Sequence, residues 1–126
     1  MSIAFVIVPH SAKLAEGVAE LAQQMAKDVE FRAAGGTEDG GIGTSFDLIY
    51  AAVEELTGAG HQVVLLTDLG SADMTVESVL EMVDPEQVHW CPGPLVEGAV
   101  SAAVTAQVGG DIEAVREAAK AKELFA

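Results

Sequence analysis

Short apolar segments rich in β-branched residues alternate along this chain with segments whose apolar residues recur every three or four positions. The apolar segments cover residues 3–8, 29–33, 63–66 and 88–91. Their length and composition are typical of strands buried on both faces of a parallel sheet. The helical segments end with an Ala/Val-rich stretch over residues 95–108 and a charged helix from Asp111 to about Lys122. This alternation predicts an α/β fold in three layers, with four parallel strands flanked by helices and joined by right-handed crossovers.

The first three helical segments each have an apolar face that we expect to pack on the sheet. These faces comprise Leu14, Val18, Leu21 and Met25, then Phe46, Ile49, Val53 and Leu56, then Val76, Val79, Leu80 and Val83. Half of the 126 residues are hydrophobic, which is sufficient for one packed core. The chain has no linker, repeat or low-complexity stretch, so we expect a single domain over residues 1–126.

The net charge of −14 restricts the partners of this chain. Nucleic acids and anionic membrane surfaces attract basic faces, so we expect neither, whereas a basic protein partner is compatible with the charge. The amino terminus lacks the basic segment of a signal peptide, and its apolar run is too short to span a bilayer. The one cysteine, Cys91, permits no intrachain disulfide and suits a reducing compartment. We therefore expect a cytoplasmic protein.

Polar residues follow the first and third predicted strands at the point where each strand ends. Residues 9–11 read Pro-His-Ser, and residues 68–71 read Asp-Leu-Gly-Ser. Open α/β sheets bind ligands beyond the carboxyl ends of their strands, where the strand order reverses. In the common order 2-1-3-4, strands 1 and 3 are neighbours. We therefore expect His10, Asp68 and the glycine-rich loop over residues 35–45 to share one crevice.

Such a crevice suits phosphoryl transfer through histidine. Asp68 can accept a hydrogen bond from one ring nitrogen of His10, which fixes the tautomer and leaves the other nitrogen free to attack phosphorus. Amides at the start of the helix after Ser11 favour an anion there. The candidate phosphate-binding residues are Ser11, Gly36, Thr44, Ser45, Gly70 and Ser71. The sequence leaves open the choice among them and which ring nitrogen is phosphorylated. We expect no metal site and no cofactor, because a phosphohistidine donor is already activated.

Each of these residues also has an ordinary structural interpretation. His10 can be a simple turn residue, and Asp68 can cap the third helix. The glycine-rich loop matches neither G-x-G-x-x-G nor the ending of a P-loop. His61 and His89 fall outside the expected crevice, and three scattered histidines make a poor zinc site. A receiver-like domain phosphorylated on Asp68 is disfavoured, because its first strand would end in metal-binding acids.

Several segments, in order, resemble a known family. Residues 6–11 (Val-Ile-Val-Pro-His-Ser) and 14–18 (Leu-Ala-Glu-Gly-Val) are similar to the opening of DhaM. DhaM is the phosphotransferase subunit of the dihydroxyacetone kinase that uses phosphoenolpyruvate instead of ATP. Residues 42–45, 68–72 and 91–98 follow in the order of that family, and Pro-Leu-Val-Glu-Gly within the last segment is the most discriminating. The turn that contains the histidine is less specific, because it is also found in the wider mannose-type EIIA family.

The resemblance implies a mannose-type EIIA-like fold and a relay with specific partners. Family members accept a phosphoryl group from phospho-HPr on a histidine that corresponds to His10, and the orienting aspartate corresponds to Asp68. They pass the group to ADP held by DhaL, which phosphorylates dihydroxyacetone bound to DhaK. The family is homodimeric, which an Ala/Val-rich helix permits, and the acidic charge suits the basic docking face of HPr.

Two departures from the family pattern and two alternative functions remain. Some DhaM proteins continue into HPr-like and enzyme-I-like domains, whereas this chain ends at Ala126, so we expect it to use a separate HPr. The usual serine before the histidine is Pro9 here, which removes one backbone donor. A sugar-specific EIIA would instead pass its phosphoryl group to an EIIB protein, although residues 91–98 favour DhaM. A regulatory module of the same fold would bind a DhaL-like partner without transferring phosphate.

Overall fold

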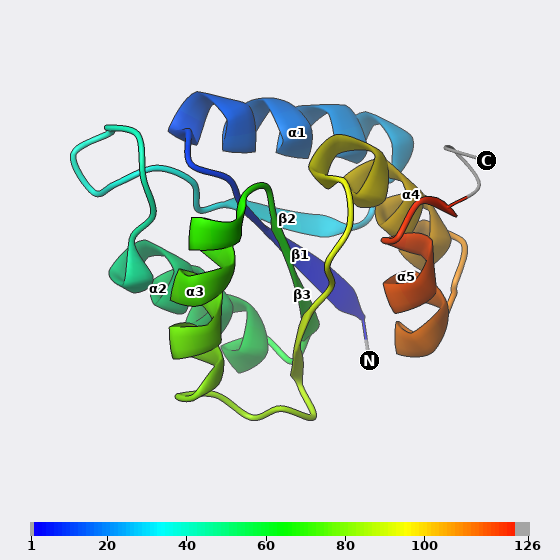
Figure 1. Cartoon of the computed structure of the whole chain (residues 1–126). Coiled ribbons are helices and arrows are strands. Elements are labelled where there is room, and N and C mark those ends of the chain that lie inside the picture. The colour runs from blue at the N-terminus through cyan, green and yellow to red at the C-terminus, as the bar shows by residue number, and fades with distance from the viewer. Residues whose placement is uncertain (1, 123–126) are drawn as a thin grey trace.

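The computed structural model describes residues 2–122, and four strands alternate with helices along them (Figure 1). The strands are β1 (Ile3–Val8), β2 (Glu30–Ala33), β3 (Gln62–Thr67) and β4 (Val88–Trp90). They form one parallel sheet in the order β2-β1-β3-β4, with Val8 of β1 opposite Thr67 of β3. The predicted α/β class, parallel sheet and strand order are therefore confirmed.

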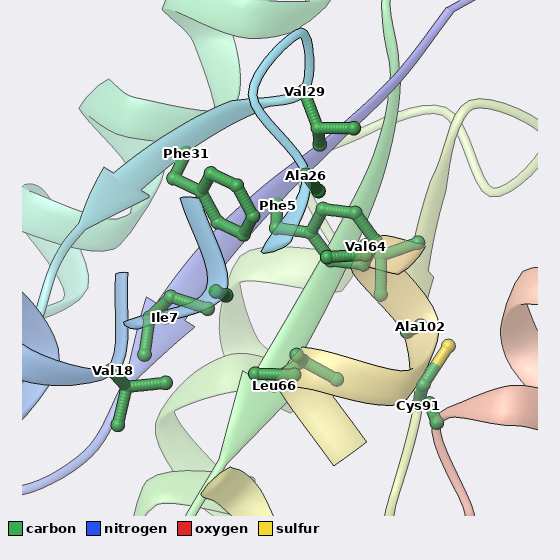
Figure 2. Packing of buried hydrophobic residues seen from close by; sticks show 14 of the residues in the cluster. Phe5, Ile7, Val18, Ala26, Val29, Phe31, Val64, Leu66, Cys91 and Ala102 are labelled. Carbon is green, nitrogen blue, oxygen red and sulfur yellow. The ribbon is translucent and has the colours of Figure 1, made fainter. Parts of the chain in front are cut away.

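Helices cover both faces of this sheet and complete the three layers. They are α1 (Ala12–Met25), α2 (Phe46–Gly58), α3 (Gly70–Leu80), α4 (Leu95–Gln107) and α5 (Ile112–Ala118). Alternate residues of β1 point to opposite sides, so that Phe5 packs with α1 and α4 while Val6 packs with α2 and α3. Figure 2 shows the first of these two cores, in which the Phe5 and Phe31 rings stack with centroids 5.5 Å apart. None of the helices within residues 2–122 is long and apolar enough to cross a membrane.

The buried face of α1 differs from the predicted one. We expected Leu14, Val18, Leu21 and Met25 to face the core. Val18 is buried, but the other three side chains are 41%, 46% and 56% exposed. Ala15 and Ala22 are fully buried in their place, because α1 packs against the alanine-rich α4 and small side chains allow two helix backbones to approach closely. The prediction was therefore right for Val18 and wrong for the other three residues, because it gave most weight to the largest apolar side chains.

The last helix is shorter than predicted. It ends at Ala118 instead of continuing to Lys122, and Ala121 adopts a positive φ of 53°. The backbone after the helix packs closely over two glycines: a Cβ at Gly93 or Gly98 would lie 2.3 or 2.5 Å from the carbonyl oxygen of Ala119. This packing turns the chain away from the helix axis.

Candidate functional site

His10 lies in the short turn between β1 and α1, and hydrogen bonds hold the backbone on both sides of it. Its own carbonyl accepts a hydrogen bond from the Gly43 amide at 2.8 Å, and the carbonyl of the buried Pro9 accepts one from the Gly36 amide at 3.2 Å. The hydroxyl of Ser11 caps α1 by accepting an amide from its first turn at 3.2 Å. The imidazole is therefore presented from a backbone fixed by both the helix and the glycine-rich loop.

Asp68 follows β3, the neighbour of β1, and its carboxylate accepts three hydrogen bonds. Oδ1 accepts from Nδ1 of His10 at 2.8 Å and from the Leu69 amide at 2.7 Å, and Oδ2 accepts from the backbone amide of His10 at 3.0 Å. Partial burial raises the pKa of Asp68, but the hydrogen bonds from the backbone and ring of His10 and from Leu69 outweigh it. The pKa of Asp68 consequently lies below its ordinary value, and the carboxylate is ionised at neutral pH.

This ionised carboxylate determines which nitrogen of His10 is nucleophilic. A carboxylate only accepts hydrogen bonds, so Nδ1 of the neutral ring carries the proton. Nε2 then has a free lone pair, and the hydroxyl of Ser71 donates to it. The side chains of His10 and Asp68 are each 17% exposed, whereas Ser71 is exposed. The ring is therefore partly open to solvent, and the exposed Ser71 hydroxyl lies on Nε2.

The start of α3 adds further polar groups beside the ring. Gly70 is the first residue of this helix and Ser71 the second, while the N-cap residue Leu69 provides no side-chain cap. Amides in the first turn of a helix have no partner within the helix and favour anions. Ser71 thus contacts the His10 ring and is directly preceded by Gly70, while the contact of these two residues with a phosphoryl group stays a prediction.

The other predicted phosphate-binding residues have partners elsewhere. Ser45 is buried, caps α2 and donates to Glu38 at 3.2 Å, and the hydroxyl of Thr44 bonds that of Thr75 at 2.7 Å. Gly36 adopts a positive φ of 79° and directs its amide to the backbone before His10. Their contact with a phosphoryl group stays a prediction.

The two remaining histidines lie near the start of β3, at the opposite end of the sheet. His61 Nδ1 is 2.6 Å from the hydroxyl of Ser2, and His89 Nε2 is 2.8 Å from Oε1 of Gln62. Burial lowers the pKa of His89, and the charge of Arg116 adds to this effect. This position agrees with the expectation that neither histidine takes part in the site.

Sequence reasoning missed three exposed apolar residues that neighbour the site along the chain, Ile42, Leu69 and Met74, which we call the apolar rim. These side chains are 78%, 62% and 70% exposed. Ile42 precedes the glycine that binds the His10 carbonyl, Leu69 follows Asp68, and Met74 lies one helical turn after Ser71. The large apolar residues Ile42 and Leu69, in segments that otherwise contain glycine and polar residues, were a signal in the sequence for this rim, whereas Met74 lies within α3.

Comparison with known proteins identifies the family that this chain matches. Residues 4–116 match the EIIA-man family, described as the fructose IIA component of the phosphotransferase system. The phosphotransferase subunit DhaM of a dihydroxyacetone kinase from Lactococcus lactis is 39% identical over 93% of this chain and 93% of its own length. A DhaM described as a phosphoryl donor subunit, from Listeria innocua, is 38% identical over 94% of both chains.

Three further similarities concern one longer relative and two solved structures. The phosphoryl donor subunit DhaM of Escherichia coli is 41% identical over 87% of this chain, which corresponds to 25% of that protein. A crystal structure of a protein of unknown function superimposes with a TM-score of 0.88 at 28% identity, over 96% of this chain and 95% of that one. The mannose/sorbose-specific IIA subunit from Enterococcus faecalis superimposes with a TM-score of 0.60 at 21% identity, over 98% of this chain and 89% of that one. The latter similarity concerns the fold alone.

Proposed function

Because this chain belongs to the EIIA-man family of the phosphotransferase system, we propose that it carries a phosphoryl group on His10 as the phosphoryl donor subunit of a phosphoenolpyruvate-dependent dihydroxyacetone kinase. The observation that carries this proposal is the pairing of Nδ1 with the Asp68 carboxylate at 2.8 Å, which leaves Nε2 nucleophilic. The curated relatives described as DhaM support the kinase assignment.

The geometry supports Nε2 as the nitrogen that accepts phosphorus. Its lone pair attacks the phosphorus atom of a donor phosphohistidine, and the donor's N–P bond breaks with its electron pair returning to the donor ring. Nδ1 keeps its proton, so the phosphorylated His10 ring is cationic, and the Asp68 carboxylate stabilises that charge. The Ser71 hydroxyl, released from Nε2, can donate to a phosphoryl oxygen, as can amides in the first turn of α3.

We assign phospho-HPr as the donor and ADP bound to DhaL as the acceptor, with DhaK downstream. The apolar rim of Ile42, Leu69 and Met74 offers a contact surface for a protein partner around the reactive nitrogen. The net charge of −14 favours a basic partner and accelerates its arrival. A cytoplasmic location suits these partners and the lone buried Cys91.

The decisive experiment supplies phosphoenolpyruvate, enzyme I and HPr to the wild-type chain and to His10→Ala. We expect base-stable, acid-labile phosphate on the wild type and none on the variant, with His61→Ala and His89→Ala labelled normally. NMR of the labelled chain should assign phosphorus to Nε2. Label that remains in His10→Ala would refute the proposal. Label that passes to an EIIB protein instead of DhaL-bound ADP would identify a sugar EIIA, and DhaL binding without any label would identify a regulatory module.

We also propose that two copies of this chain form a homodimer. Exposed apolar residues gather on α1 and α4, which pack side by side, and include Leu14, Leu21, Met25, Val96 and Val104. Apolar residues of this size on one face are typical of a protein interface. Sedimentation of the wild type should give twice the chain mass, and Leu21→Glu should give the monomer.

A further inference from the structure

Thr67 is a buried polar residue whose hydroxyl joins three elements beneath the candidate site. It is the last residue of β3 and is only 6% exposed. Its Oγ1 accepts a hydrogen bond from Nε1 of Trp90 at 3.2 Å and donates one to Oδ1 of Asp73 at 2.6 Å. The hydroxyl therefore links β4, β3 and the first turn of α3 in one chain of hydrogen bonds.

This series of hydrogen bonds ends at Asp73, two residues after Ser71, whose hydroxyl contacts Nε2 of His10. Asp73 follows Ser71 in the first turn of α3, and the N-cap of that helix has no side-chain cap. Besides the contact between Ser71 and His10, side-chain hydrogen bonds tie α3 to its surroundings through Thr67 on the sheet side and through the Thr44–Thr75 bond of 2.7 Å on the loop side. Thr67 also directly precedes Asp68, the other residue that contacts the His10 ring.

We propose that Thr67 is a positioning residue for phosphoryl transfer, because its hydroxyl fixes the first turn of α3 and thereby holds Ser71 on Nε2 of His10. This inference rests on the proposed function, since it concerns the transfer step at the same site. Removal of the hydroxyl leaves the Trp90 N–H and the Asp73 carboxylate without their shared partner. The start of α3 is then free to shift relative to β3, and small displacements of groups around a reacting atom are costly for the rate.

The hydrogen bond from Trp90 supplies a direct optical readout of this network. Trp90 is the one tryptophan of the chain, so intrinsic tryptophan fluorescence comes from a single ring that donates to Thr67. Thr67→Val preserves the shape of the side chain and removes its hydroxyl, so we expect a changed emission maximum or intensity. Thr67→Ser keeps the hydroxyl and should retain the wild-type spectrum.

The kinetic experiment measures phosphorylation by phospho-HPr in the full chain. We expect Thr67→Val to lower kcat, the rate constant of labelling at saturating phospho-HPr, by up to about tenfold with KM unchanged, because positioning acts on the transfer step and not on docking. Thr67→Ser should restore the rate. Thr105→Val is the matched control, since it removes a hydroxyl that donates to the Ser101 carbonyl at 2.9 Å on the distant α4, and it should leave kcat and the fluorescence unchanged.

The outcomes separate this inference from the proposed function. A folded Thr67→Val chain with the kcat of the wild type, or with a loss confined to KM, would overturn the positioning role. If circular dichroism shows that Thr67→Val does not fold, Asp73→Ala removes the acceptor of the same hydrogen bond at a partly exposed position. A normal kcat in that variant overturns the inference equally. Absence of label on the wild type would refute the proposed function instead, and the fluorescence of Thr67→Val would still test the hydrogen-bond chain.

Discussion

Replacement of Asp68 by asparagine tests the chemistry of the site most directly. The two carboxylate oxygens accept three N–H groups, two from His10 and one from Leu69. An amide has one oxygen, so its NH₂ group must face at least one of these donors in either orientation. Where the NH₂ faces Nδ1, the favoured tautomer carries its proton on Nε2, and that nitrogen is no longer nucleophilic.

The size of the effect follows from the charge that develops on the ring. Transfer of phosphorus to Nε2 makes the imidazole cationic beside an ionised carboxylate whose nearest oxygen is 2.8 Å from Nδ1. Unit charges about 4 Å apart attract by about 4 kcal/mol at an effective dielectric constant of about 20. The amide dipole retains a minor part of this attraction, so we expect a loss of about 3 kcal/mol, which slows transfer by about 10²-fold.

Rapid-quench labelling from phospho-HPr, analysed at alkaline pH to preserve phosphohistidine, measures this rate. Asp111→Asn is a matched control, because Asp111 caps the distant α5 by accepting the Ala114 amide at 2.9 Å, a bond that asparagine can also make. We expect that control to label as fast as the wild type. Labelling of Asp68→Asn at the wild-type rate would show that neither the tautomer nor the charge of the phosphorylated ring depends on this carboxylate.

Four further predictions concern single features of the structure. Ser71→Ala should slow labelling by about tenfold, less than the loss of a buried oxyanion donor, because the exposed hydroxyl has water as a substitute; single-turnover labelling measures this. Gly98→Ala should lower the free energy of unfolding by about 1–3 kcal/mol in a urea titration, because its Cβ would lie 2.5 Å from the Ala119 carbonyl oxygen. Burial raises the pKa of the Cys91 thiol to about 11, so the native chain should resist a thiol reagent at neutral pH and react once unfolded. Since the native pKa of Asp68 is lowered from 3.8, its contribution to stability is present above that value and is lost as the pH falls through the native pKa, and urea midpoints of Asp68→Asn should show a weaker decline in this acid range.

The juxtaposition of His10 and Asp68 could be predicted from the sequence because it depends on strand order alone. Both residues follow strands that lie next to each other in the sheet, and parallel neighbours end at the same edge. Neither rotamers nor packing details enter this argument. The same holds for the alternation of strands and helices, which follows from the periodicity of apolar residues.

The sequence could show only in part which of the candidate hydroxyl groups contacts the reactive nitrogen of His10. Ser45 immediately precedes the helix that we expected to begin at Phe46, so its role as an N-cap was readable from the sequence. The contact of Ser71 with Nε2 depends on the placement of α3 against the sheet. That placement involves the bond from Thr67 to Asp73, which joins two residues of different elements through specific rotamers. Sequence periodicity contains no information on such a bond.

The exposed face of α1 shows a different limit of the sequence. Leu14, Leu21 and Met25 share the helical spacing of a core face, but the neighbouring alanines face α4 instead. A periodic apolar stripe predicts a face that avoids water, and it does not distinguish the core of one chain from an interface between two. The homodimer proposal would explain the discrepancy, because the same stripe would then be covered by a second copy.

The three hydrogen bonds at Asp68 also bear on how one histidine can serve two partners in turn. The Asp68 carboxylate accepts hydrogen bonds from the backbone amide of His10 as well as from its ring. The carboxylate orients the ring, and the backbone of His10 in turn fixes the carboxylate. The proposed phosphorylation of Nε2 would leave both of these bonds intact, because neither involves that nitrogen. The ring would therefore keep one orientation before and after it receives phosphorus. In the proposed transfer, a donor and an acceptor that approach in succession would find the phosphoryl group at the same position, and neither step would require the ring to turn.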